Sequence, residues 1–490
     1  MIIKKNSNLS LPQKKWAIHI QDAVVLGLSM LFLSACAPTI HAPSLTSVHA
    51  PHMEKTVQML EANHPLPTGS WPQQDWWRTL KIGPLDQIMS AAIAHSPVLA
   101  ASQSELEWAS AMTKLRGAAL GPQLTGTASI TPLQFSGNGP LGALGLGNKF
   151  YDSGDIGFGF RQSLDFWGKR KDRVQAALGK ERADAARLAD TRRLLTGAIA
   201  YQYLDWCLAS QQFALTKRLL VIAQNREHLL QTRQKLGLGS DISVTSEQVD
   251  IHQLQSSVEK WAGRADDARI ALANLANLDP DSIAIDPTYP RENVLPTLPA
   301  NLRLDLLAHR PDVQAARDMA LARISETKAA QAEFYPDISF STLLDFNSAS
   351  MATLLNPASF AYAFGPAIHL PFFTSGALHA QLRAAEAKQS EAVAIYEQTI
   401  LEATRQVLTA LSSWNSSSDQ WSAQQKASRS AQQREKLVAR RRELGVDNQL
   451  TVLVTKAQMI EQQKQETLLY YHRLQAWVDL ETALGGGYGQ

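Results

Sequence analysis

The sequence of 490 residues has only two cysteines, Cys36 and Cys207. If Cys36 serves another purpose, no disulfide framework is possible. Charge of one sign is also lacking, because 47 Lys and Arg residues stand against 45 Asp and Glu residues, for a formal net charge of +2. This balance does not provide the basic footprint of a nucleic-acid-binding protein. We therefore expect no nucleic-acid partner.

The usual signatures of catalysis are missing as well. The sequence has no phosphate-cradling P-loop, no helix with paired zinc-binding histidines and no nucleophile elbow. We therefore predict that the protein is not an enzyme and has no catalytic or metal site. Four histidines and a methionine near the N-terminus could hold a metal in principle, but histidines scattered among prolines are more typical of a solvated linker. These residues are His41, His49, Met53, His52 and His64.

Proline is absent from residues 169–235, where apolar and polar residues recur at helical spacing. Roughly 67 residues at about 1.5 Å each give a rod on the order of 100 Å long. A turn at 236–241 leads into a return helix whose apolar residues are spaced alternately three and four apart, as in a coiled coil. This helical hairpin, over 169–278, is too long to be the core of a compact domain. We expect it to project and to pack against copies of itself.

The same hairpin occurs again 208 residues later, over 376–484. Gly168 aligns with Gly376, and the Leu-Gly pair at Gly237 aligns with the pair at Gly445. Upstream the offset is 214, as Pro122 and Pro336 show. The protein is therefore an internal duplication. We predict a first structural repeat over 71–290, a second over 291–484 and a disordered tail over 485–490.

The N-terminus has the features of a lipoprotein leader. Lys14 and Lys15 precede an apolar run over 23–33, which is too short to span a bilayer. The run ends in Leu33-Ser34-Ala35-Cys36, which resembles a bacterial lipobox, whose cysteine is acylated and becomes the mature N-terminus. An ordinary signal peptide with an incidental cysteine is the alternative. We predict a signal peptide over 1–35, a covalent lipid on Cys36 as the only prosthetic group, and an acylated tether over 36–70.

Within each repeat the period changes from helical to alternating, which predicts strands at about 122–132, 155–165, 337–346 and 359–370. Each strand has an apolar face and a face of polar or minimal residues. In a soluble sandwich the apolar face would point to a core, whereas in a membrane barrel it would point to lipid. Four strands cannot close even the smallest membrane barrel, which needs about eight. The barrel must then be shared between chains.

This pattern resembles the TolC-like outer-membrane factor family, and within it the lipoprotein branch of multidrug efflux channels. The resemblance covers the chain from Trp76 to about Leu484, although Gly117 and Gly121 depart from the alanine expected there. It rests on the twin Leu-Gly turns and on the stretches His309-Arg310-Pro311-Asp312, Phe334-Tyr335-Pro336-Asp337-Ile338 and Leu370-Pro371-Phe372-Phe373.

The resemblance implies a mostly α-helical fold with a small β part. It also implies a homotrimer whose 12-stranded transmembrane barrel in the outer membrane continues into a periplasmic tunnel of 12 helices. An inner-membrane pump of the RND type and a periplasmic adaptor would be its partners, with the adaptor docking on the helix tips. Ala37 follows the lipobox cysteine in place of the acidic residue that retains such lipoproteins at the inner membrane, which favours the outer membrane.

The helix tips are the candidate sites of such a duct. Asp241 and Asp447, each presented three times by a trimer, would form an anionic ring that gates the periplasmic mouth. The structural alternative is that each aspartate only caps the following helix. We expect Gly237, Gly239 and Gly445 to supply the positive φ of tight turns. The adaptor would dock on the backbone exposed there and on Arg441, although a solvated helix face is the plainer interpretation of the three arginines at 440–442.

We therefore predict a passive outer-membrane channel that conducts small molecules such as drugs from a tripartite efflux pump to the exterior. The same duct in an ABC-driven type I protein export system is an alternative. A coiled-coil scaffold of the envelope, without a pore, is another. We expect Cys207 to be a buried, unreactive thiol, since it shares an apolar helical stripe with neighbouring aromatic residues.

Overall fold

The structure is a computed structural model that describes residues 38–47, 55–57, 59, 66–284, 286–290, 296–299 and 308–489. The predicted signal peptide and Cys36 lie outside these residues, as do His49, His52, Met53 and His64. The chain forms two compact units. The sheet unit contains 109–181, 319–393 and the described residues up to Ser47. The helical unit contains 182–318, 394–489 and the described residues between Val48 and Trp108, gaps excepted. Each unit draws on both repeats.

The two repeats are nearly equal in their elements, which confirms the duplicated unit. Their long helices, α6 and α10, have 67 residues each. The preceding helices, α4 and α9, have 22 residues each. The first repeat consists of α3 (Gly83–His95), α4 (Pro97–Ala118), β2 (Gln123–Gln134), β3 (Phe150–Leu164), α6 (Lys169–Lys235) and α7 (Asp241–Ala276). The second consists of α9 (Pro311–Ala332), β5 (Asp337–Ser348), β6 (Phe360–His369), α10 (Ala377–Glu443) and α11 (Gln449–Ala483).

Shorter elements lie between these. They are η1 (Leu45–Ser47), β1 (Thr68–Gly69), η2 (Trp76–Leu80), α5 (Pro140–Ala143), η3 (Pro280–Ser282), β4 (Leu298–Pro299), η4 (Met351–Thr353) and η5 (Pro357–Ser359). The strands β1 and β4 pair in parallel within the helical unit. Part of the segment predicted to be a tether is thus held by backbone pairing.

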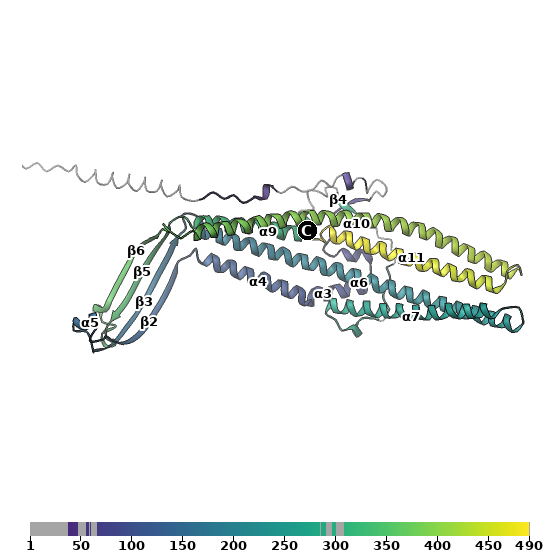
Figure 1. Cartoon of the computed structure of the whole chain (residues 1–490), viewed down its shortest axis with the longest axis horizontal. Helices are drawn as coiled ribbons and strands as arrows, with labels where there is room; N and C mark the ends of the chain where they lie inside the picture. Colours follow the sequence, from purple (N-terminus) through teal and green to yellow (C-terminus); the bar gives the residue numbers. More distant parts are fainter. Residues whose placement is uncertain are drawn as a thin grey trace, which may run out of the picture. The chain divides into compact units, whose positions relative to one another are not determined.

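The strands β2, β3, β5 and β6 form one antiparallel sheet in that order (Figure 1). The register places Phe158 of β3 opposite Gly126 on one side and Leu344 on the other, and Leu344 opposite Tyr362. These residues share the apolar face, and the residues between them form the polar face. The alternation predicted from the sequence is therefore present in the sheet, with Gln162 and Thr342 as polar residues on the apolar face and Leu343 as an apolar residue on the polar face.

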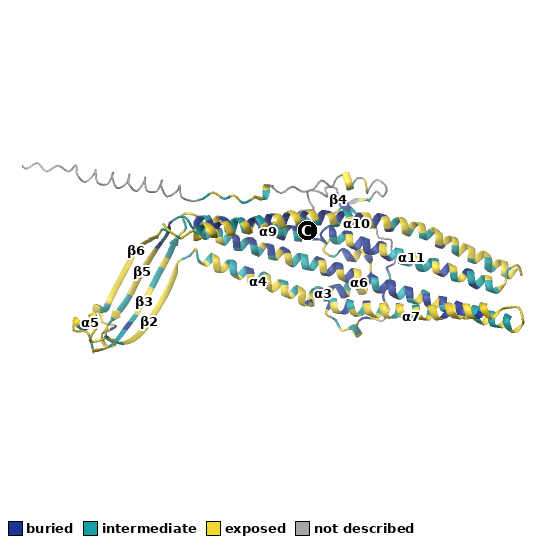
Figure 2. Ribbon diagram, viewed as in Figure 1, coloured by how far each residue is buried: buried dark blue, intermediate teal, exposed yellow. Residues whose placement is uncertain are grey.

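The apolar face of the sheet is exposed rather than covered (Figure 2). Leu124 is 70% exposed, Phe158 60% and Phe364 70%. β2 and β6 are the two edges, since each pairs with a strand on one side only. The sheet of one chain thus has an uncovered apolar face and two edges. In the part of the chain that the structure describes, none of the helices combines the length and the apolar character needed to cross a membrane.

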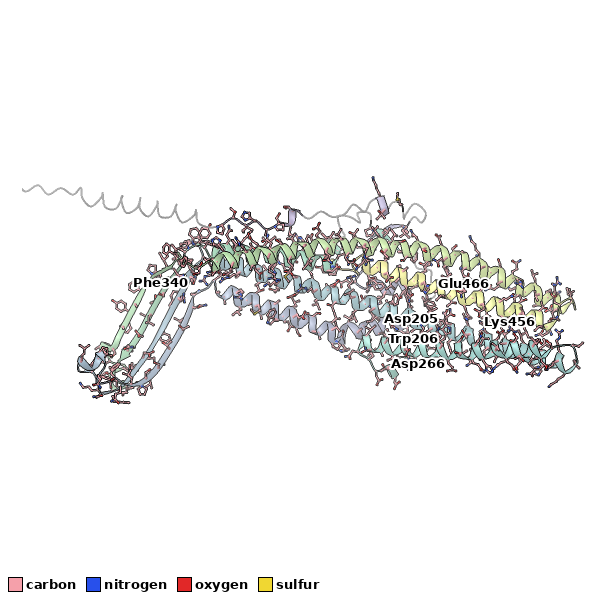
Figure 3. All side chains as sticks on the ribbon, in the orientation of Figure 1. Asp205, Trp206, Asp266, Phe340, Lys456 and Glu466 are labelled. Carbon is pink, nitrogen blue, oxygen red and sulfur yellow. The ribbon has the colours of Figure 1, made fainter. Side chains whose placement is uncertain are left out.

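The core of the helical unit is built around tryptophan. Trp76 and Trp77 of η2 are buried, and the Trp76 ring meets Trp477 of α11 edge-on with the ring centroids 5.3 Å apart. Trp206 of α6 is buried in the same cluster. Asp205 beside it (Figure 3) forms an ion pair with Arg264 of α7, with the nitrogen and oxygen atoms 2.8 Å apart. The two helices of the first hairpin are thereby joined on both an apolar and a charged face.

Cys207 belongs to this core and is fully buried. Burial raises the pKa of its thiol far above the usual range, so that the reactive thiolate does not form at physiological pH. The prediction of an inert thiol agrees with this environment.

The fully buried Arg310 gives the His-Arg-Pro-Asp stretch a structural role. Its guanidinium donates to Asp312 Oδ1 at 2.9 Å, to Gln406 Oε1 at 2.9 Å and to the carbonyl oxygen of Ala483 at 2.8 Å. Arg193 donates likewise to the carbonyl oxygen of Thr482 at 2.9 Å. Burial alone would raise the pKa of Asp312, but the hydrogen bonds and charge of Arg310 lower it. Two arginines therefore satisfy carbonyl groups at the C-terminus of α11.

The predicted disordered tail is wrong for residues 485–489. Gly485 N–H donates to Thr482 O at 3.1 Å and Gly486 N–H to Glu481 O at 3.0 Å, which extends the end of α11. A Cβ at Gly487 would lie 2.4 Å from the backbone of Gln73. A run of glycines predicts disorder, whereas here the missing side chains allow the backbone to pack closely.

Candidate functional site: the helix turns and the ends of the strands

The first turn, between α6 and α7, ends α6 by a glycine in the left-handed conformation. Gly237 has φ +70°, its N–H donates to Gln234 O at 2.9 Å, and Leu238 N–H donates to Arg233 O at 2.8 Å. This is the hydrogen-bond pattern of a glycine-terminated helix. Ser240 then caps α7, because its side chain accepts from Ser243 N–H. The turn is therefore fixed at both ends.

The second turn, between α10 and α11, repeats this geometry. Gly445 has φ +73°, and Val446 N–H donates to Arg441 O at 2.9 Å. Asn448 caps α11, accepting from Thr451 N–H at 2.9 Å. Only two of the three turn glycines have positive φ, so the prediction for Gly239 is wrong. Its lack of a side chain allows a close approach to α6, since a Cβ there would lie 3.2 Å from Gln234 N.

The two predicted gate aspartates stand just inside these turns, and neither is the capping residue. Asp241 is the first residue of α7 and accepts a hydrogen bond from Gln234 Nε2. Asp447 accepts from Arg441 Nε at 2.7 Å, and its side chain is 19% exposed. Each carboxylate is held by a side chain of the preceding helix. The structural alternative of simple N-caps therefore does not apply, since Ser240 and Asn448 fill that role.

The turns also carry exposed apolar residues, which sequence reasoning missed. Leu236 is 69% exposed and Leu238 66% in the first turn, and Ile242 at the start of α7 is 81% exposed. Leu444 and Val446 in the second turn are similar. The sequence contains a signal for them. Loops are usually polar, so leucines that flank the turn glycines are unusual. Clustered exposed apolar residues mark contact surfaces.

The ends of the strands in the sheet unit are joined to the long helices by aromatic and charged contacts. Trp167 Nε1 donates to Pro336 O at 3.0 Å, and its ring stacks on Tyr335 with the centroids 4.8 Å apart. We call this level the foot of the sheet. Phe372 and Phe373, which follow β6, are 90% and 88% exposed there. Phe340, near the same end of β5, is labelled in Figure 3.

A charge cluster at the foot was not predicted. Lys169 Nζ lies 3.1 Å from Glu333 Oε2 and 3.7 Å from Asp337 Oδ2, and Arg170 lies 3.5 Å from Asp337. Arg173 also pairs with Glu333. These contacts join the start of α6 to the end of α9 and the start of β5. The basic run at 169–171 was the available signal, but its acidic partners lie far away in sequence.

Cavities of about 620 and 440 Å3 lie in the helical unit. Arg193 lines both. Its guanidinium is held by Asp190 at 2.7 Å and by Thr482 O, so structural contacts account for this charged group. Of the N-terminal histidines, His41 lies in the described residues, where its ring makes a 3.3 Å hydrogen bond with Thr39.

Comparison with known protein families identifies the family of this chain. A family described as outer membrane efflux protein matches residues 88–278 and 302–486, one match in each repeat. The chain belongs to this family. Its place is therefore the outer membrane, and the TolC-like resemblance is confirmed.

Individual relatives agree along nearly the whole chain. The chain is 27% identical over 472 residues to the multidrug resistance outer membrane protein MdtQ of Escherichia coli O157:H7, covering 94% of this chain and 96% of MdtQ. The outer membrane protein VceC of Vibrio cholerae is 27% identical with a TM-score of 0.76, over 85% of this chain and all of VceC. The outer-membrane channel OprN shares the fold, with a TM-score of 0.80 at 20% identity, over 92% of this chain and 99% of OprN. The predicted fold class, mostly α-helical with a small sheet, is confirmed.

Proposed function

We propose that three copies of this chain form a passive duct through the outer membrane. The duct conducts small molecules, such as drugs, that an inner-membrane pump of the RND type delivers through a periplasmic adaptor. The pump supplies the energy, and the chain itself carries out no chemical step. The name of the relative MdtQ supports small molecules as the cargo.

The four-stranded sheet carries this proposal. Its apolar face is exposed, and its edges β2 and β6 have unpaired backbone groups that cannot remain unsatisfied in lipid. If β2 of one copy pairs with β6 of the next, three sheets close a barrel of 12 strands and remove every edge. The apolar face then contacts lipid, and the polar face, with Arg161, Asp155 and Asp345, lines the pore.

The helix turns form the periplasmic mouth in this proposal. Asp241 and Asp447 contribute six carboxylates per trimer, which favour cations and whose hydrogen bonds to Gln234 and Arg441 hold the turns in their resting shape. The adaptor docks on the tips at Gly237, Gly239, Gly445 and Arg441 and covers the exposed leucines beside them. Acylation of Cys36 adds a lipid anchor in the outer membrane.

Disulfide cross-linking in outer-membrane preparations tests the shared barrel. In a Cys207→Ser background, cysteines replacing Thr127 on the β2 edge and Ala363 on the β6 edge should yield dimers and trimers on oxidation, once neighbouring positions have been scanned for register. The control pair replaces Thr125 and Gly159, which are partners within one chain, and should cross-link without change of mass. If no edge pair links copies while the control pair forms, the shared barrel is wrong.

Conductance tests the pore separately. The purified protein in a planar bilayer should show single channels, whereas an envelope scaffold without a pore gives none. A strain that lacks this chain should regain resistance to small toxic compounds with the wild-type gene, while export of a protein substrate would point to the type I duct instead.

A further inference from the structure

The segment 38–47 of the predicted tether lies along the helices of the sheet unit, and we call it the strap (Figure 1). Gln331 Nε2 donates to the carbonyl oxygen of Pro38 at 2.8 Å. The N–H of His41 donates to Glu386 Oε1 at 2.8 Å. Gln389 Nε2 donates to the carbonyl oxygen of Pro43, also at 2.8 Å. Two helices, α9 and α10, thus hold one short peptide at three points.

All three hydrogen bonds go to the backbone of the strap. Gln389, the residue that holds Pro43, is only 4% exposed when the strap is docked. Its donation to Pro43 gives the amide nitrogen of this buried side chain a hydrogen-bond partner. The helices therefore form a binding site for an extended peptide, and the peptide is the N-terminal segment of this chain.

The duplication supplies an internal comparison for these side chains. At the offsets of 214 and 208, the residues equivalent to Gln331, Glu386 and Gln389 in the first repeat are Gly117, Leu178 and Glu181. The helices of the two repeats have equal lengths all the same. Only Glu181 among these is polar, so the fold of the helices does not require polar side chains at Gln331 and Glu386, and binding of the strap explains their presence.

The strap runs towards the sheet when followed back to the N-terminus. Pro43 is held twelve residues into α10, about 18 Å from its start at 1.5 Å per residue. Pro38 is held by Gln331, one residue before the end of α9 and six before the start of β5. Cys36 precedes Pro38 by two residues in the sequence.

We propose that the strap is a positioning device that fixes the acyl anchor of Cys36 at the foot of the sheet. Resting on the proposed acylation of Cys36, this inference adds that the anchor is held in register with the barrel by Gln331, Glu386 and Gln389. A loose tether over 36–70 would allow the lipid to enter the bilayer at many positions around the molecule. The docked strap instead restricts the point where the lipid enters the bilayer.

Distance measurement between spin labels tests the strap in the full-length protein in lipid nanodiscs. One label replaces Thr39 on the strap and the other replaces Ala384, an exposed residue of α10, in the Cys207→Ser background. With the labelled chain diluted in excess unlabelled chain, so that pairs between copies do not contribute, we expect one narrow distance distribution within the chain. The double variant Gln331→Ala with Gln389→Ala should widen it at least twofold. The matched control Gln381→Ala removes an exposed glutamine from the same helix and should leave it unchanged.

The unacylated protein, made as Cys36→Ser and measured in detergent, separates the strap from the lipid. The distribution should stay narrow, because the side chains of α9 and α10 hold the strap without help from the membrane. A broad distribution in the wild type would overturn the proposal. So would a distribution that stays narrow in the double variant, or one that is narrow only in the acylated protein. None of these results depends on whether the protein forms a trimer or a pore, so failure here is distinct from failure of the duct.

Discussion

At the residue scale, the two helix turns differ in how they hold their aspartates. Asp447 has an ion pair with Arg441, whereas Asp241 has a neutral partner, Gln234. An exposed ion pair contributes about 0.2–1 kcal/mol to stability. The second turn is therefore held by a contact that salt weakens, and the first is not.

Replacing both Asp241 and Asp447 by alanine should raise the closed-state conductance of the channel a few-fold. The reason is that both turns lose the contact to the preceding helix, and about 1 kcal/mol corresponds to roughly a fivefold change in a population. Recordings in planar bilayers measure this. Asp266→Ala, which removes an exposed carboxylate of α7 away from the turn (Figure 3), is the control. A closed-state conductance equal to that of the wild type would remove the aspartates as a gate.

Glu481, in the last turn of α11, predicts a pH dependence of stability. Burial raises its pKa from the ordinary value of 4.5 to about 7, although a hydrogen bond with Trp477 opposes the shift. The folded state therefore binds a proton more tightly than the unfolded state does. The contribution of Glu481 to the free energy of unfolding is complete below about pH 4.5 and is lost as the pH rises through 7.

Thermal unfolding in detergent between pH 4.5 and 7.5 measures this effect. The free energy of unfolding of the wild type should decline as the pH rises. Glu481→Gln should reduce this decline by up to about 3 kcal/mol, since each unit of pKa shift corresponds to about 1.4 kcal/mol. Glu397→Gln, at an exposed position of α10, serves as the comparison. Parallel curves for the wild type and Glu481→Gln would contradict the assignment.

At the scale of elements, the same substitution should have opposite effects at two glycines. Gly445→Ala forces a Cβ onto φ +73° and should destabilise the turn by about 1 kcal/mol. Gly263→Ala lies inside α7 with nothing within 4 Å of the new Cβ, so it should stabilise that helix by a similar amount. Hydrogen exchange of the two hairpins distinguishes them. Faster exchange at both sites, or at neither, would show that the local backbone does not set their stability.

The long hairpins could be predicted closely from the sequence. The missing prolines and the glycine turns gave α6 as 169–235, which is its extent in the structure. The strands followed from their alternation. The charge cluster of Lys169, Glu333 and Asp337 could not be predicted, because its members are about 165 residues apart in sequence. The strap was missed for a different reason, since backbone recognition leaves no pattern in the residues that are recognised.

At the scale of the whole molecule, compactness does not follow the repeats. The repeats are consecutive in sequence, but each compact unit combines segments of both. Sequence periodicity identifies the repeated element, whereas the compact units depend on which elements of the two copies pack together. β3 and β5, from different repeats, pair through eleven residues and make one sheet of two hairpins.

Within the second repeat, Arg310 links the start of α9 to α10 and α11 in the helical unit. It contacts Gln406 of α10 and the end of α11, and its equivalent in the first repeat is Ser96. Arg310→Ala leaves Asp312 without its buried partner and should cost about 3 kcal/mol or more. Arg317→Ala, half exposed on α9, should change the stability by less than about 0.5 kcal/mol. Equal unfolding temperatures for the two variants would contradict this role.

The grip on peptide groups in the strap has an evolutionary consequence. Side chains over residues 38–47 can drift without loss of the docking bonds, while Gln331, Glu386 and Gln389 cannot. Related chains should therefore conserve the amide side chains at Gln331 and Gln389 and the carboxylate at Glu386. The sequence of the strap itself should vary.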